Sequence, residues 1–132
     1  MTRYLFLAAF FTVGLMVAFA PAQATRPAVP KIDAEQFDKL RKAPNSVVLD
    51  VRTPQEFAQG HVPGAVNMDI SDPTFRKKIA ELDKSKTYLV HCAAGIRSNR
   101  ACNMMSSLGL AGLYDYKGGF KDWKAQGKPI EK

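Results

Sequence analysis

Two kinds of hydrophobic pattern alternate along the chain from residue 32 to residue 132. Short apolar runs rich in valine, leucine and tyrosine predict four strands, at residues 46–51, 65–68, 87–91 and 113–116. Between them, capping residues and apolar positions three or four apart predict helices that begin near residues 33, 53, 72, 98 and 120. Strands that alternate with helices form parallel sheets with helices on both faces. We therefore expect a three-layer α/β fold around a small, mainly parallel β-sheet.

Two helix starts carry specific local signals. Asp33 and Gln36 have the spacing of a capping box, in which each side chain accepts a hydrogen bond from the backbone of the other residue. Thr53 and Glu56 have the same spacing, and Pro54 suits the first position of a helix. Both pairs therefore predict where a helix begins.

Two further helices follow from the spacing of apolar residues. Asp72-Pro73 is expected to open a helix with Phe75, Ile79 and Leu82 on one face. Residues 98–108 are expected to form another, because their apolar positions repeat at intervals of three and four. The residues between the third strand and residue 98 would then form a loop.

The first 24 residues differ in composition from the rest of the chain. Arg3 is their only charged residue, and residues 5–20 form an uncharged, mostly apolar run of 16 residues. Ala22-Gln23-Ala24 follows with the small-x-small pattern of a cleavage site. These features are typical of a secretory signal peptide cleaved after Ala24. The alternative is an uncleaved membrane anchor, for which the run is shorter than the ~20 residues that usually span a bilayer.

Cleavage after Ala24 would leave a periplasmic or secreted protein of one domain. Residues 25–31 contain two prolines and no periodic pattern, so they predict an extended lead-in. Residues 32–132 then form the domain, which contains no segment long and apolar enough to cross a membrane. The mature form is therefore expected not to span a membrane.

The net charge and the number of cysteines exclude some classes of protein. The formal net charge is +7, from 19 basic and 12 acidic residues. Basic residues do not alternate with aromatic ones, so we expect no nucleic-acid partner but a solvated basic surface that attracts small anionic substrates. Two cysteines exclude a disulfide scaffold. No apolar helix face is left over for a partner copy, which favours a monomer.

Cys92 stands at the end of the third predicted strand, and such strand ends carry the reactive groups in sheets of this kind. The residues after it are small as far as Gly95, and the chain then enters a helix. Successive backbone N–H groups and the positive end of the helix would face the sulfur. Arg97 adds a positive charge, so the pKa of Cys92 should be depressed. The predicted chemistry is a nucleophilic thiolate in an anion-binding loop.

Four segments in fixed order then indicate a family. They are L-D-V-R-T-P-Q-E-F at 49–57, G-H-V-P-G-A-V-N at 60–67, C-A-A-G-I-R-S at 92–98 and G-G-F-K-D-W at 118–123. In this order and spacing they resemble the single-domain rhodaneses, which are sulfurtransferases of the thiosulfate:cyanide type. With the signal peptide, the resemblance implies a secreted or periplasmic rhodanese-like domain.

The resemblance implies roles for individual residues. Cys92 would form a persulfide, and Arg97 would orient the donor and stabilise the leaving anion. Asp50 and Arg52 would support the loop, and the motif at 118–123 would serve packing. The substrate would be bound by the loop residues Ala93, Ala94, Gly95, Ile96, Arg97 and Ser98. Cys92 would pass sulfur from a small anionic donor such as thiosulfate to cyanide, a small thiol or a protein thiol, with no metal or organic cofactor required.

The loop length favours sulfur over phosphate. Four residues separate Cys92 from Arg97, whereas cysteine phosphatases and the related arsenate reductases have five, which surround a phosphate. Two further alternatives keep the same loop. One is a sulfur-carrier or partner-binding module with little activity on thiosulfate. The other is a non-catalytic binding domain, against which the presence of Cys92 and Arg97 argues.

The other sulfur and imidazole groups predict structural roles. Cys102 lies among apolar residues of the predicted helix at 98–108, which favours a core thiol. Its distance from Cys92 along that helix is too long for a disulfide. His61 and His91 lack the spacing of a metal site and are interpreted as structural.

Overall fold

The computed structural model of the protein describes residues 14–22 and 25–132. In this part of the chain, five strands form one sheet in the order β1-β5-β4-β2-β3, with parallel pairing throughout. The strands are β1 (Lys31–Ile32), β2 (Ser46–Asp50), β3 (Val66–Asn67), β4 (Thr87–His91) and β5 (Leu113–Tyr116). The helices are α1 (Ala34–Leu40), α2 (Pro54–Gln59), α3 (Phe75–Ala80), α4 (Ile96–Ser107) and α5 (Gly119–Ala125). The predicted α/β fold with a parallel sheet is confirmed.

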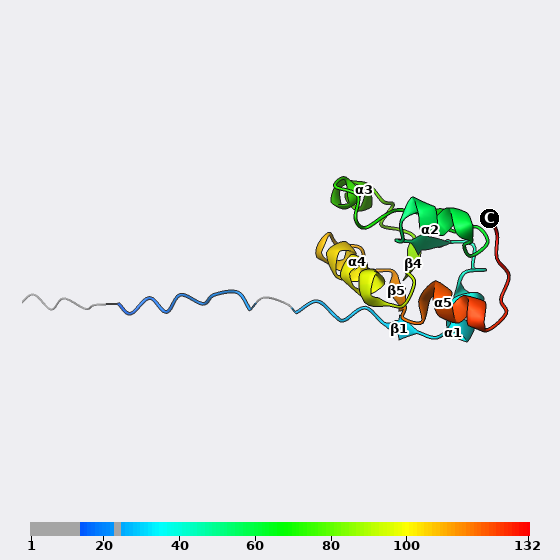
Figure 1. Ribbon diagram of the computed structural model, residues 1–132. Coiled ribbons are helices and arrows are strands. Elements are labelled where there is room, and N and C mark those ends of the chain that lie inside the picture. The colour runs from blue at the N-terminus through cyan, green and yellow to red at the C-terminus, as the bar shows by residue number, and fades with distance from the viewer. Residues whose placement is uncertain (1–13, 23–24) are drawn as a thin grey trace, which may run out of the picture.

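Helices cover both faces of the sheet (Figure 1). On one face, α3 and α4 bury apolar side chains such as Met105 against Val90. On the other face, α1 and α5 bury Phe37 and Trp123 together with Leu89. Leu89 and Val90 are neighbours on β4, the middle strand, and both are fully buried. A strand covered on both faces needs this continuous apolar run.

Both predicted capping boxes are present. The Gln36 N–H donates to the Asp33 carboxylate at 2.9 Å, and the Asp33 N–H donates to the Gln36 side chain at 3.1 Å. The Glu56 N–H donates to the Thr53 hydroxyl at 3.2 Å, and the Thr53 N–H donates to the Glu56 carboxylate at 3.4 Å. Because these contacts are local, the starts of α1 and α2 were predictable from four residues.

The sheet contains one strand that the hydrophobic pattern does not predict. The proline-containing lead-in joins the sheet at Lys31, which lies opposite Asp115 of β5. The Asp115 N–H donates to the carbonyl of Pro30 at 2.9 Å. A strand of two residues is too short for a pattern of its own, so it depends on the free edge that β5 offers.

The third helix begins later than its sequence suggests. The prediction that Asp72-Pro73 opens this helix is wrong, because α3 starts at Phe75. The Asp72 carboxylate accepts hydrogen bonds from the N–H and the hydroxyl of Thr74, at 2.8 and 2.7 Å, and these bonds form a turn ahead of the helix. Leu82 lies beyond the last helical residue but still packs against the core.

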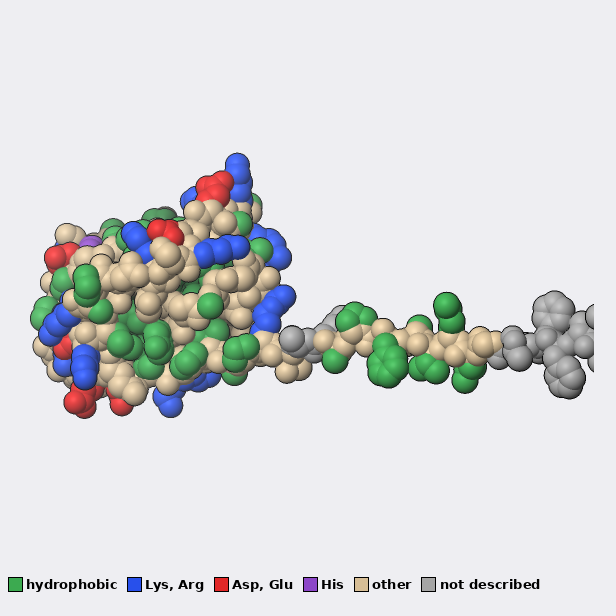
Figure 2. Space-filling model, turned by 180° about the vertical axis from the view of Figure 1, so that it is seen from behind, with side chains coloured by type: hydrophobic (Ala, Val, Ile, Leu, Met, Phe, Trp, Pro, Cys, Tyr) green, Lys and Arg blue, Asp and Glu red, His purple; other side chains and the backbone are tan. Residues whose placement is uncertain are grey.

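Residues 14–22 precede the domain and form no helix or strand. Their apolar side chains, among them Met16 and Phe19, are exposed. Figure 2 shows hydrophobic side chains along the segment that projects from the domain. The predicted signal peptide also covers residues 1–13 and 23–24, which lie outside the described residues, as does the cleavage position at Ala24. Within the described part of the chain, no helix has the length and apolar character needed to span a bilayer.

Candidate active site

Cys92 directly follows β4, at the carboxyl end of the middle strand. The Gly95 N–H donates to the Cys92 sulfur at 3.1 Å. Ala94 and Ser98 lie near enough to this sulfur to lower its pKa through their polar groups. Cys92 is buried, whereas Ala94 and Ile96 in the same loop are exposed. The sulfur is therefore enclosed by polar groups beneath a loop that faces solvent.

The polar groups around Cys92 favour the charged form of its sulfur. Burial alone would raise the pKa of Cys92, because a charge is poorly solvated inside a protein. The polar groups of Ser98, Gly95 and Ala94 outweigh burial, and the pKa of Cys92 lies below its ordinary value. A larger share of this cysteine is therefore thiolate, which is the nucleophilic form.

The helix after the loop begins at Ile96, two residues before the predicted start at residue 98. Arg97 consequently lies in the first turn of α4 and not in the loop. Gly95 makes the early start possible, because it caps the helix with a φ of 96°, a conformation that suits glycine. A Cβ at this position would lie 2.4 Å from the carbonyl oxygen of Lys117. The same tight turn directs the Gly95 N–H at the sulfur.

The motif at residues 118–123 does more than pack. Trp123 is fully buried, in agreement with the prediction. Gly119, however, lies against the active loop, where a Cβ would stand 2.5 Å from the carbonyl oxygen of Ala93. The N–H groups of Phe120 and Lys121 donate to the carbonyls of Cys92 and Ala93, at 2.8 and 3.0 Å. The start of α5 therefore holds the cysteine loop in place, which the interpretation as packing alone missed.

The side chain of Arg97 is held by a residue of another helix and does not extend freely into the cysteine loop. Its guanidinium donates two hydrogen bonds to the Glu56 carboxylate of α2, at 2.7 and 3.0 Å. These bonds bring the pKa of Glu56 down to about 2, against the opposing effect of burial. Glu56 is thus a member of the site that the sequence analysis recognised only as a capping residue. Glu56 lies in the motif segment at 49–57, and Arg97 lies in the motif segment at 92–98. The occurrence of both segments in one chain was the sequence signal that could have indicated a role for Glu56 in the site.

Asp50 and Arg52 form a buried pair beside the site. The Arg52 guanidinium donates to the Asp50 carboxylate at 2.7 Å and to the carbonyl of Gly60 at 2.8 Å. It also lies over the ring of Phe120, 4.1 Å from the ring centre. Within residues 25–132, neither side chain forms a hydrogen bond with the sulfur, and Arg52 instead contacts Phe120, whose N–H holds the Cys92 carbonyl.

His91 precedes Cys92 and points to the opposite face of the sheet. Its Nδ1 lies 3.0 Å from the carbonyl oxygen of Cys92, so Nδ1 carries the proton in this contact. Its Nε2 is buried without a hydrogen-bond partner among the described residues, 3.7 Å from Asp50. Burial lowers the pKa of His91, against the opposing effect of Asp50. The neutral imidazole of His91 therefore supports the backbone of Cys92 through this hydrogen bond.

Comparison with known proteins agrees with this site. A profile of the rhodanese-like domain matches residues 33–126. The chain belongs to the rhodanese-like domain family. A protein named sulfurtransferase from Allochromatium vinosum is 30% identical over 103 residues, which cover 77% of this chain and 94% of that protein. The thiosulfate sulfurtransferase GlpE of Pseudomonas putida is 37% identical over 95 residues, which cover 72% of this chain and 84% of that protein.

Solved structures support the rhodanese-like fold. A rhodanese-related protein from Thermoplasma volcanium superposes with a TM-score of 0.69 at 35% identity, covering 77% of this chain and 97% of that chain. The Alr3790 protein from Anabaena superposes with a TM-score of 0.66 at 31% identity, covering 76% and 90%. The predicted family is therefore confirmed at the level of the single domain.

The second cysteine of the rhodanese-like domain is a core residue. Cys102 is buried in α4, and both cysteines are free. Burial raises the pKa of Cys102 to about 12, so this thiol stays protonated. The ring of His61 stacks on Phe57 at 3.8 Å and takes no part in the loop. Across residues 14–22 and 25–132, no three His, Cys, Asp or Glu side chains gather as a metal site would require.

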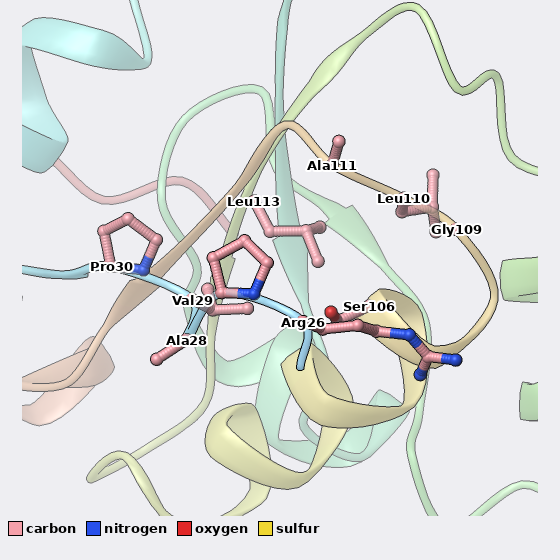
Figure 3. A pocket seen from close by; sticks show the side chains of 10 residues that line it. Arg26, Ala28, Val29, Pro30, Ser106, Gly109, Leu110, Ala111 and Leu113 are labelled. Carbon is pink, nitrogen blue, oxygen red and sulfur yellow. The ribbon is translucent and has the colours of Figure 1, made fainter. Parts of the chain in front are cut away.

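Figure 3 shows a hollow of about 460 Å³ between the lead-in and the end of α4. The lead-in with Val29 and Pro30 forms one wall, and Ser106, Leu110 and Leu113 form the other. None of its lining residues belongs to the loop at 92–98. The nucleophile and its hydrogen-bond donors, and not the size of this hollow, therefore locate the candidate active site.

Proposed function

We propose that this rhodanese-like domain is a sulfurtransferase that carries sulfane sulfur as a persulfide on Cys92. The observation that supports this is the Gly95 N–H directed at the Cys92 sulfur at 3.1 Å, together with the lowered pKa of that sulfur. Fixed donors of this kind stabilise negative charge on the attacking thiolate and on the persulfide that follows. The relatives named thiosulfate sulfurtransferase favour thiosulfate as the donor.

The reaction proceeds in two half-reactions. The Cys92 thiolate attacks the outer sulfur of thiosulfate, the S–S bond of the donor breaks, and sulfite leaves with the bonding electron pair. Cys92 then holds a persulfide anion. Cyanide attacks the outer sulfur of that persulfide, thiocyanate leaves, and the Cys92 thiolate is restored. Sulfur, charge and electrons balance between donor and acceptor, so the chemistry needs no metal or organic cofactor.

Arg97 acts on the anions of this reaction from a fixed position. Glu56 holds its guanidinium with two hydrogen bonds and leaves part of the side chain exposed, at 31%. Arg97 orients the donor and stabilises the sulfite that leaves. The backbone of the loop, over Ala93 to Ser98, binds the remaining oxygen and sulfur atoms of the substrate.

The same ion pair favours a second candidate function. Glu56 offsets the charge of Arg97, the basic residue of the loop motif, so the site attracts a dianion such as thiosulfate only weakly. The persulfide group of a thiol carries a single negative charge and loses less by this pairing. The alternative is therefore a sulfur carrier that exchanges sulfur with small persulfides or with a protein thiol and turns thiosulfate over slowly.

We further propose that the protein works in the periplasm or outside the cell. The signal-peptide pattern of residues 1–24 supports this location, with cleavage after Ala24. The mature form would begin at Thr25 and would be a monomer that spans no membrane. Expression of the full chain in a secreting bacterium tests this proposal, because a periplasmic product whose mass begins at Thr25 would support it. A full-length product retained in the membrane fraction would favour the anchor.

Intact-mass measurement tests the sulfur chemistry directly. The purified domain is incubated with thiosulfate, then with cyanide, and its mass is read after each step. We expect a gain of one sulfur atom that cyanide removes, present in Cys102→Ala and absent in Cys92→Ser. A gain with polysulfide but none with thiosulfate would favour the carrier. No gain with any donor would reject sulfur transfer and favour a non-catalytic binding domain.

A further inference from the structure

The hollow between the lead-in and the end of α4 has a largely apolar wall (Figure 3). Val29 and Pro30 line it from the lead-in, and Leu110, Ala111 and Leu113 line it from the chain that follows α4. Its volume is about 460 Å³. Sites for small organic ligands have volumes of about 300–1,000 Å³ and walls of this apolar kind. The hollow is therefore large enough to hold the apolar part of a small molecule.

Contacts with the sheet hold the lead-in in this position. The Asp115 N–H of β5 donates to the Pro30 carbonyl at 2.9 Å, and the Lys31 ammonium group donates to the Asp115 carboxylate at 2.9 Å. The side chain of Val29 packs against the core on the α4 face of the sheet. Every lining residue follows Ala24, so the proposed cleavage would leave the hollow complete.

The polar groups at the hollow are a hydroxyl and two cations. Arg26 and Ser106 supply the polar side chains of its lining, and no carboxylate of the described residues lines it. A Cβ on Gly109, another lining residue, would lie 3.4 Å from Lys84 Nζ, so this ammonium group stands at the rim. Neither Arg26 nor Lys84 forms an ion pair within residues 14–22 and 25–132. Both positive charges are therefore available to a ligand.

An apolar hollow edged by two unpaired cations fits a ligand with an apolar chain and a negative head. The chain gains free energy by leaving water, and a carboxylate at the rim would face Arg26 and Lys84. A neutral hydrocarbon would leave both cations without a partner, and a cationic head would be repelled by them. The lining thus favours one class of small molecule over the two others.

We propose that this hollow is a binding site for an amphiphilic carboxylate, a molecule with an aliphatic chain and one negative charge. The site is separate from the proposed function, because none of its lining residues belongs to the cysteine loop.

Amide chemical shifts of the full chain, measured by nuclear magnetic resonance, test the proposal with octanoate as the probe. We expect saturable shifts at Val29, Leu110 and Ala111. Octylammonium has a similar chain with the opposite charge and should bind at least about fivefold more weakly. Acetate has the charge without the chain and should cause no saturable shift there. Equal affinities for octanoate and octylammonium, or no saturable octanoate shift at the hollow, would overturn the proposal.

Three substitutions of Ser106, in the last turn of α4, change the hollow itself. Ser106→Trp fills it and should abolish the octanoate shifts. Ser106→Glu supplies a carboxylate of its own, so it should weaken octanoate binding more than the neutral Ser106→Gln of equal size. Octanoate shifts that persist in Ser106→Trp would overturn the proposal. So would changed signals of residues 14–22 in Ser106→Trp without ligand, because the chain's own apolar segment would then be the occupant.

Surface substitutions test the charges without depending on the Ser106 variants folding. Arg26→Gln and Lys84→Gln should each weaken octanoate binding about two- to fivefold and leave octylammonium no weaker. Lys39→Gln is the matched control, since Lys39 is exposed like Lys84 but belongs to α1, on the other face of the sheet. Unchanged octanoate affinity in both charge variants, or an equal loss in Lys39→Gln, would overturn the proposal.

Sulfur loading is measured by mass in the same variants and should match that of the wild type. Failed loading in the wild type with intact octanoate binding would reject the proposed function alone. Intact loading without octanoate binding would reject the amphiphile site alone.

Discussion

The guanidinium of Arg97 and the carboxylate of Glu56 form two parallel hydrogen bonds, 2.7 and 3.0 Å long. Glu56 also closes the capping box of α2 with Thr53, so its own position is fixed by a helix start. Arg97 follows Cys92 in the first turn of α4. The pair therefore connects the start of α2 to the sulfur loop, and it sets both the direction and the net charge of the basic group beside the nucleophile.

Replacing Glu56 by glutamine should improve the use of thiosulfate. The amide still accepts a hydrogen bond from Arg97, but the positive charge is no longer offset. We expect kcat/KM for thiosulfate to rise about two- to fivefold at low ionic strength, because partly exposed pairs of this kind are worth about 0.2–1 kcal/mol. The gain should vanish at high salt and be smaller for a persulfide donor of lower charge. A fall in kcat/KM for thiosulfate would mean that Glu56 serves orientation alone.

The same pair should make part of the stability depend on pH. The pKa of Glu56 is about 2 in the folded protein, because Arg97 donates to it, against an ordinary value of 4.5. A lowered pKa stabilises the fold above the unfolded value, and this contribution is lost as the pH falls from 4.5 toward 2. The difference in unfolding free energy between wild type and Glu56→Gln should therefore be largest above pH 4.5 and shrink toward pH 2.

Urea unfolding across this pH range measures the difference. Glu81→Gln is the control, since Glu81 is exposed and has no ion pair among the described residues. Its difference from wild type should not follow the pattern of Glu56→Gln. A Glu56→Gln difference that stays constant from pH 6 to pH 3 would contradict the prediction.

Local signals in the sequence predicted most of this fold. Asp33 with Gln36 and Thr53 with Glu56 make contacts within four residues, so the helix starts that they mark are correct. Strand β4 was predictable to the residue, because it is buried on both faces and has a continuous apolar run. Cys92 was identified as the central residue because the end of such a strand is where reactive groups lie.

Contacts between distant segments explain what the sequence did not predict. Lys31 becomes part of a strand only because it lies beside Asp115, 84 residues away. Glu56 meets Arg97 across 41 residues, and no pattern within either segment specifies that contact. The early start of α4 depends on Gly95 fitting against the Lys117 carbonyl, a close approach that only the folded chain creates.

Thiol labelling should distinguish the two cysteines. The pKa of Cys102 is about 12, so only about one molecule in ten thousand carries that thiolate at pH 8. The pKa of Cys92 lies below the ordinary 9.0. We expect a small alkylating agent to add once per chain, in wild type and in Cys102→Ala alike, and not at all in Cys92→Ser. Two additions in the wild type at this pH, or one in Cys92→Ser, would contradict the assignment.

Gly119 should prove essential to the active loop for a reason other than its backbone conformation. Its φ is 66°, and a Cβ would lie 2.5 Å from the Ala93 carbonyl and 2.6 Å from the Cys92 carbonyl. Gly127 has a φ of 67° with nothing within 4 Å of a Cβ, so Gly127→Ala reports the cost of the left-handed backbone alone. That cost is about 1–2 kcal/mol.

Gly119→Ala should cost about 1–3 kcal/mol more than Gly127→Ala in urea unfolding, because the loop backbone must move away from the new methyl group. Displacing the carbonyls of Cys92 and Ala93 also shifts the N–H groups that hold the thiolate. We therefore expect Gly119→Ala to raise the pKa of Cys92 and to slow sulfur loading, whereas Gly127→Ala leaves both unchanged. Equal stability losses with equal loading rates would show that the start of α5 does not hold the loop.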